Sequence, residues 1–181
     1  MPRLAGIALA ALAAVLLVGC GGNGNPTVAK VGGESITQKQ LDAVVAHFRS
    51  EAQREGKSFP DEKSAGFRQL RNRLLGLLVY RAELRRAGDR LGLKVTDSEI
   101  SKRLVTPAGG EQEGRSGDTF PRDSVASQIL FERIFDTVTR EVKAPTQAEL
   151  SARRNKAMAD FVARLQRETQ VSYEPGFAPG S

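Results

Sequence analysis

Apolar residues are spaced in two different ways along this chain. Leu4–Val18 is a continuous apolar run, whereas the apolar residues of the remaining chain recur mainly at every third or fourth position. The second spacing places apolar side chains on one face of a helix, so it predicts a series of amphipathic helices. The predicted helices begin near Thr37, Asp61, Thr96, Asp123 or Ser124, and Thr146.

Three of these helix starts carry a capping-box pattern, in which Thr is followed three residues later by Glu or Gln. The pairs are Thr37 with Gln40, Thr96 with Glu99, and Thr146 with Glu149. Gly56 and Gly92 lie where a glycine would end the first and second helices. The second helix is apolar on nearly every side between residues 74 and 79, which predicts a central, buried position.

Short β-prone runs lie near both ends of this helical region. One pair flanks Gly32-Gly33, a dipeptide typical of a tight hairpin turn, and the other run is Val171–Glu174. The expected fold class is therefore mainly α, with about five helices and a small β-hairpin and strand element in one domain over 27–174. Within it, the glycine-rich segment 106–119 is expected to be a mobile loop, and residues 175–181 after the domain are expected to be a flexible tail.

The first 25 residues have the features of a secretory signal. Arg3 provides a positive start, and the apolar run after it is shorter than the roughly 20 residues that cross a bilayer. Leu17–Cys20 resembles a bacterial lipobox, which implies cleavage before Cys20 and acyl chains on that residue. Residues 1–19 are then the signal peptide and 20–26 a lipidated tether. The alternative is an ordinary signal peptide with an incidental cysteine.

The composition excludes several classes of site. The single cysteine cannot form an intramolecular disulfide or a thiolate metal cluster, and P-loop, G-x-S-x-G and HExxH motifs are absent from the sequence. His47 is expected at a helix surface or boundary, and Glu83 near Arg86 is read as part of a solvated face. The net charge of +6 is spread along the helices, so it does not indicate nucleic-acid binding. We expect no cofactor and no metal.

The order of these elements resembles the N-terminal domain of SurA/PrsA-type extracytoplasmic foldases. The segments that carry the resemblance are VAKVGGESITQKQLD, LLGLLVYRAELRRAGDRLGLKVTDSEISKRL, VKAPTQAEL and VARLQRETQVSYEPGFAP. Together they cover about Thr27 to Pro179. In that family the last two segments enclose a parvulin prolyl-isomerase domain. Here Leu150 is followed by SARRNKAMADF, within the predicted final helix, with no room for another domain, and the sequence has His47 alone in place of the paired histidines usual in parvulin sites.

The resemblance implies a chaperone without catalytic activity, so we do not expect an enzyme. The expected function is a lipid-anchored holdase on the extracytoplasmic face of the cell membrane, with unfolded or newly translocated polypeptides as partners. Phe48 and Phe59 are the expected client-facing residues, with a place in the core as their alternative. The alternatives for function are a lipoprotein adaptor for one specific envelope partner and a prolyl isomerase of degenerate activity.

Overall fold

The computed structural model describes residues 25–105 and 119–178. The predicted signal peptide, Cys20 and most of the tether, together with residues 106–118 of the predicted loop and the last three residues of the tail, lie outside the described residues. The elements are β1 (Thr27–Val31), β2 (Glu34–Thr37), α1 (Gln38–Arg54), α2 (Ala65–Arg90), α3 (Asp97–Val105), α4 (Phe120–Thr139), α5 (Gln147–Glu168) and β3 (Val171–Tyr173). The prediction of a mainly helical fold with a small sheet is confirmed.

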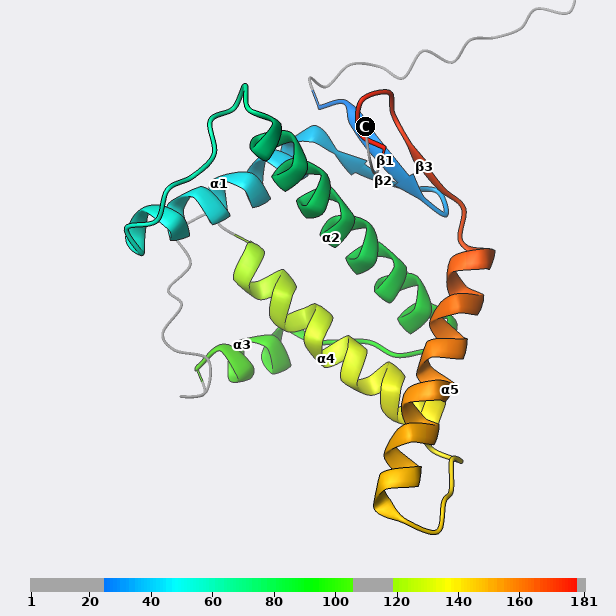
Figure 1. The fold of residues 1–181 in the computed structure, drawn as a ribbon. Coiled ribbons are helices and arrows are strands. Elements are labelled where there is room, and N and C mark those ends of the chain that lie inside the picture. Colours follow the sequence, from blue (N-terminus) through cyan, green and yellow to red (C-terminus); the bar gives the residue numbers. More distant parts are fainter. Residues whose placement is uncertain (1–24, 106–118, 179–181) are drawn as a thin grey trace, which may run out of the picture.

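The sheet joins the two ends of the described chain. β1 pairs with β2 across the Gly32-Gly33 turn, where both glycines have positive φ angles of +53° and +97°. Glycine adopts these angles at little steric cost, which is why this dipeptide forms the tight turn. β3 pairs antiparallel with the other edge of β1, and Val31 lies opposite Val171. The chain therefore returns to its start after α5, as Figure 1 shows.

The predicted caps of α1 and α3 are present in full. The backbone nitrogen of Gln40 donates to Thr37 Oγ1, and the backbone nitrogen of Thr37 donates to Gln40 Oε1 at 2.7 Å. Thr96 and Glu99 form the same reciprocal pair at the start of α3. Each pair satisfies two of the amide groups that a helix start leaves without an intrahelical partner.

The boundaries of α2 and α4 differ from the sequence prediction. α2 begins at Ala65 with Ser64 as its cap, because the chain makes a turn from Asp61, whose carbonyl accepts a hydrogen bond from the Ser64 amide. α4 begins at Phe120 rather than after Asp123 or Ser124, and Thr119 precedes it without a side-chain cap bond. Its second residue is a proline, which a first helical turn accommodates because the amide hydrogens there have no intrahelical acceptor.

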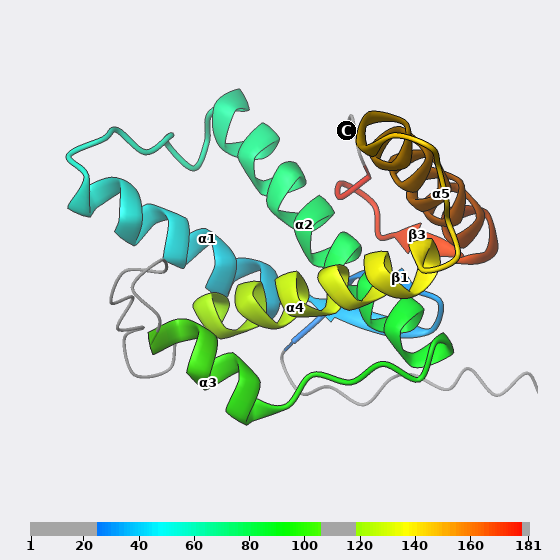
Figure 2. The same cartoon turned by 90° about the horizontal axis from the view of Figure 1, so that it is seen from below.

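The core consists of two clusters that meet along α2. The first lies between the sheet, α1 and α2 as far as Ala82, and its fully buried members include Val28, Val31, Leu41 and Leu75. The second joins the later half of α2 to α4 and α5. α2 is thus the central helix, with α1, α4 and α5 around it, and α3 lies beside α4 (Figures 1 and 2).

The contact between α2 and α4 is unusually close at one point. A Cβ atom added to Gly88 would lie 2.7 Å from Cδ1 of Leu130, which is too short for two carbon atoms. Glycine at this position lets the backbone of α2 approach the Leu130 side chain. The two helices are therefore held against each other near the end of α2, while their surfaces separate into a groove nearer its middle.

Candidate functional site

The groove between α2 and α4 is lined by one face of each helix. Its volume is about 310 Å³. Both faces repeat at positions i, i+3, i+4 and i+7, the spacing of a continuous helical stripe: Leu77, Tyr80, Arg81 and Leu84 on α2, and Ser124, Ser127, Gln128 and Phe131 on α4. We call this space the α2–α4 groove.

Two large aromatic side chains of the α2–α4 groove remain partly exposed to solvent. Tyr80 is 42 % exposed and Phe131 is 37 % exposed. Phe131 is held by a ring contact with Phe135, whose centroid lies 6.4 Å away and which packs against the second core cluster. The groove therefore presents fixed apolar surface that another apolar group could cover.

Arg81 forms a polar wall of the α2–α4 groove. Its side chain is buried, and its Nη2 donates a hydrogen bond to Ser124 Oγ at 2.6 Å. The guanidinium lies 4.4 Å from the ring centroid of Phe120, which is a cation–π distance. Burial lowers the pKa of Arg81, and the negative charge of Asp123 partly offsets that effect. These contacts fix the charge in place between the two helices.

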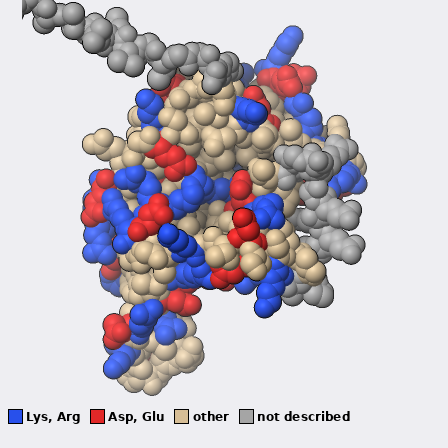
Figure 3. All heavy atoms as spheres, turned by 180° about the vertical axis from the view of Figure 1, so that it is seen from behind, with Lys and Arg blue, Asp and Glu red and all other residues tan. Residues whose placement is uncertain are grey.

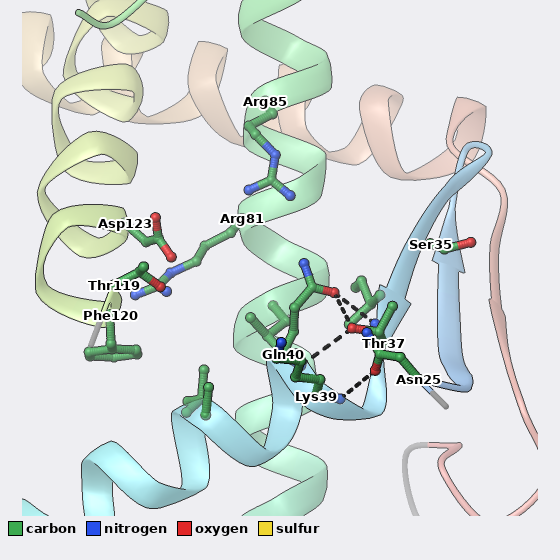
Figure 4. Close-up of a pocket in the computed structure, with 14 residues that line it drawn as sticks. Asn25, Ser35, Thr37, Lys39, Gln40, Arg81, Arg85, Thr119, Phe120 and Asp123 are labelled. Carbon is green, nitrogen blue, oxygen red and sulfur yellow. Dashed lines mark hydrogen bonds between the residues drawn. The ribbon is translucent and has the colours of Figure 1, made fainter. Parts of the chain in front are cut away.

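A second cleft lies on the other side of Arg81, between β2, the start of α1, α2 and the start of α4. Its volume is about 520 Å³, and Figure 4 shows Arg81 and Arg85 reaching into it from α2. Several of its polar groups have structural partners: Arg85 is paired with Glu34, and the Lys39 backbone amide donates to Asn25 Oδ1. These bonds join α2 to β2, and α1 to the chain before β1, around this cleft, whereas the two large aromatic side chains that stay partly exposed, Tyr80 and Phe131, line the α2–α4 groove.

Phe48 and Phe59, the predicted client-facing residues, both lie away from the α2–α4 groove. Each is partly buried against the first core cluster. The ring of Phe48 lies 5.2 Å from that of Phe120, and the ring of Phe59 lies 6.3 Å from that of Phe67. Their role toward clients stays a prediction, and the structure does not bring them together with Tyr80.

The prediction for His47 is wrong, because this side chain is buried at 7 % exposure. Its ring stacks on Phe120 at a centroid distance of 4.2 Å, and its Nε2 lies 3.4 Å from Glu51 Oε1. The reason is the early start of α4, whose first residue covers the face of α1 that carries His47. The histidine therefore contributes to the packing of α1 against α4.

Charged side chains of both signs share the surface. Figure 3 shows one face, on which lysine and arginine lie among aspartate and glutamate rather than in one continuous basic patch. Ion pairs between elements include Arg90 with Glu168 at 2.6 Å and Arg122 with Asp97 at 3.0 Å.

In the described ranges, no group of three His, Cys, Asp or Glu residues could hold a metal ion. None of the described helices is long and apolar enough to span a membrane.

The model of one protein family, the SurA-like N-terminal domain, matches residues 3–115, which is more than half of the 181-residue chain. The chain belongs to this family. The predicted family resemblance is thereby confirmed, and the family is chaperone-like. No curated protein matches the chain. The match includes β1, β2 and α1 to α3, so the α2 side of the α2–α4 groove belongs to the SurA-like region and the α4 side follows it.

Sequence reasoning missed the α2–α4 groove as a site. Leu77, Tyr80 and Leu84 have the spacing of a helical stripe, but residues that face a core have the same spacing. A stripe that lines a groove differs from a stripe that faces a core only in how far α4 covers it. That coverage depends on how α2 and α4, which are far apart in the sequence, cross each other. The sequence does offer one signal, since Ser124, Ser127 and Gln128 place polar residues on the facing stripe of α4.

Proposed function

We propose that this SurA-like protein is a holdase, which binds unfolded polypeptides reversibly and prevents them from aggregating. The observation that carries the proposal is the pair of partly exposed aromatic rings, Tyr80 and Phe131, on the facing helices of the α2–α4 groove. Membership in a chaperone-like family supports the same function. In this proposal, apolar side chains of a client cover the two rings.

The size of the groove suits brief binding of one or two client side chains. A volume of about 310 Å³ is at the lower end of the range for small-molecule pockets. Covering the exposed parts of two rings provides only a small part of a stable interface, so each contact is weak and reversible. A holdase needs this property because the client must leave in order to fold. The proposed mechanism involves binding alone and includes no catalytic step.

We further propose that the protein acts on the extracytoplasmic face of the cell membrane, held there by acyl chains on Cys20. The support for this is the sequence, in which the lipobox-like LVGC ends the apolar run. One acyl chain binds a membrane only weakly and reversibly, whereas two chains anchor a protein stably. Clients would then be polypeptides that emerge from the membrane in an unfolded state. Aromatic and aliphatic segments of such chains are exposed before they fold.

Suppression of aggregation tests the holdase proposal. The purified protein is mixed with a client unfolded by reduction or heat, and light scattering is followed at increasing ratios of protein to client. We expect scattering to fall in proportion to the protein added, and the protein to be released when the client is refolded. Unchanged scattering at a severalfold excess contradicts the proposal. Isolation of one stoichiometric folded partner would instead support an adaptor.

A further inference from the structure

A third groove lies between α2, the end of α5 and β3, next to the α2–α4 groove. Its volume is about 520 Å³. Its lining comes from the middle of α2 and from the chain around the end of α5 and β3: Gly76, Val79, Tyr80, Glu83, Gln166, Thr169, Val171 and Tyr173. We call it the α2–β3 groove. Tyr80 lines both grooves, so the two form one continuous surface along α2.

Glu83 is the charged residue of this lining, and it has an unusual environment. It is half-buried, yet its carboxylate makes no hydrogen bond or ion pair with any described residue. The sequence predicts a solvated face with Arg86 nearby, but Arg86 instead donates to the carbonyl oxygen of Gly32. Burial raises the pKa of Glu83, because the charged form loses hydration without gaining a partner.

Two tyrosines lie close enough to Glu83 to be affected by its charge. The pKa values of Tyr80 and Tyr173 are both raised, first by burial and then by the negative charge of Glu83. Two aromatic rings beside a carboxylate form an arrangement suited to a cation, since both the charge and the ring faces attract it. A lysine or arginine side chain would supply the partner that the Glu83 carboxylate lacks.

Thr169 provides a second, independent sign that the α2–β3 groove is incomplete. This residue is 4 % exposed and lines the groove, and its hydroxyl Oγ1 is buried without a hydrogen-bond partner in the described part of the chain. A buried hydroxyl without a partner costs free energy. A polar ligand in the groove could remove that cost by accepting or donating one hydrogen bond.

The backbone of β3 favours a polypeptide over a small amine as the ligand. β3 is an edge strand, and Gln170 and Glu174 exchange hydrogen bonds with the β1 side through Gly32 and Val28. Alternate residues of an antiparallel strand point their amide and carbonyl groups the other way. Those of Val171 and Tyr173 therefore face away from β1, where an extended segment can pair with them.

We propose that the α2–β3 groove binds a lysine or arginine side chain of an extended client segment, with its ammonium or guanidinium group at Glu83 between Tyr80 and Tyr173. This inference rests on the proposed holdase function and adds a charge preference to it. A client segment with a basic residue near an apolar one would occupy both grooves at once. Because the carboxylate has already lost part of its hydration, its attraction for a cation is stronger here than on an open surface.

Peptide binding to the purified protein tests this preference directly. Two fluorescent, acetylated and amidated heptapeptides rich in valine and leucine are compared by anisotropy; one has a central lysine, and the other has norleucine there. Norleucine keeps the aliphatic chain and removes the charge. We expect the lysine peptide to bind roughly tenfold more tightly, a difference that 1 M salt reduces.

A pair of matched variants assigns the preference to Glu83. Glu83→Gln is expected to remove the difference between the two peptides, while Glu141→Gln, the same change at an exposed position after α4, retains it. Equal binding of both peptides to the unchanged protein overturns the cation site but leaves the holdase proposal standing if aggregation is still suppressed. A lysine preference that survives in Glu83→Gln also overturns the site. Binding of neither peptide overturns the cation site, and it overturns the holdase proposal as well if aggregation is also not suppressed.

Discussion

Replacement of both exposed rings of the α2–α4 groove tests whether this surface holds clients. The variant is Tyr80→Ser with Phe131→Ser. Full burial of a large apolar side chain contributes about 1.5–3 kcal/mol. Since 42 % of Tyr80 and 37 % of Phe131 remains exposed, a client can gain about 0.6–1.2 kcal/mol from covering each ring. The two together are worth about 1–2.5 kcal/mol, or a loss of roughly tenfold in affinity for the variant.

The assay measures the affinity for a permanently unfolded client by fluorescence anisotropy, and in parallel the ratio needed to suppress aggregation. Val105→Ser is the matched control, because Val105 is 84 % exposed and does not line the groove. Circular dichroism must show that the double variant keeps its helices, since the buried parts of both rings also stabilise the fold. A folded double variant that binds as tightly as the control would refute the assignment of the groove.

Three further outcomes follow from the structure and the sequence. Ile134→Ala leaves a cavity at a fully buried position in the second core cluster. Urea titrations are expected to show a free energy of unfolding that is lower by about 2–5 kcal/mol, and a smaller loss would contradict tight packing at this position. The pKa of Glu99 is lowered to about 2 by hydrogen bonds from the Thr96 backbone and from Arg133. Because the pKa is lower in the folded state, Glu99 stabilises the protein above about pH 4.5, and this contribution disappears as the pH falls toward 2. The thermal unfolding temperature of Glu99→Gln should therefore depend less on pH between these two values. An unchanged pH dependence would exclude a contribution of Glu99 ionisation to stability. Cys20→Ser is expected to move the protein from the membrane fraction to the aqueous fraction, and its retention in the membrane fraction would argue against lipid anchoring.

Local signals in the sequence predicted much of the fold. A capping box such as Thr37 with Gln40 satisfies amide groups within one turn, so its effect does not depend on the rest of the protein. The same holds for Gly92, whose φ of +68° ends α2 while the Leu93 amide donates to the carbonyl of Gly88. These features could be read from neighbouring residues alone.

Features that depend on contacts between distant helices could not be predicted in this way. α4 begins early after Thr119, which makes no side-chain cap bond, so the local signal of this start is limited to Pro121 in the first turn. The burial of His47 follows from that start, because Phe120 then stacks on it. The grooves depend likewise on how far α4 and β3 cover α2. The stripe that contains Tyr80 and Glu83 looks the same in sequence whether it is covered or open.

Site-specific cross-linking directly measures contact between a client and the α2–α4 groove. A photoactivatable phenylalanine analogue is introduced in place of Phe131, and in a second protein in place of Val105. We expect an unfolded client to be cross-linked strongly at position 131 and weakly at position 105, and the folded client to be cross-linked at neither. Equal cross-linking at both positions, or none at position 131 while aggregation is still suppressed, would contradict client binding in the α2–α4 groove.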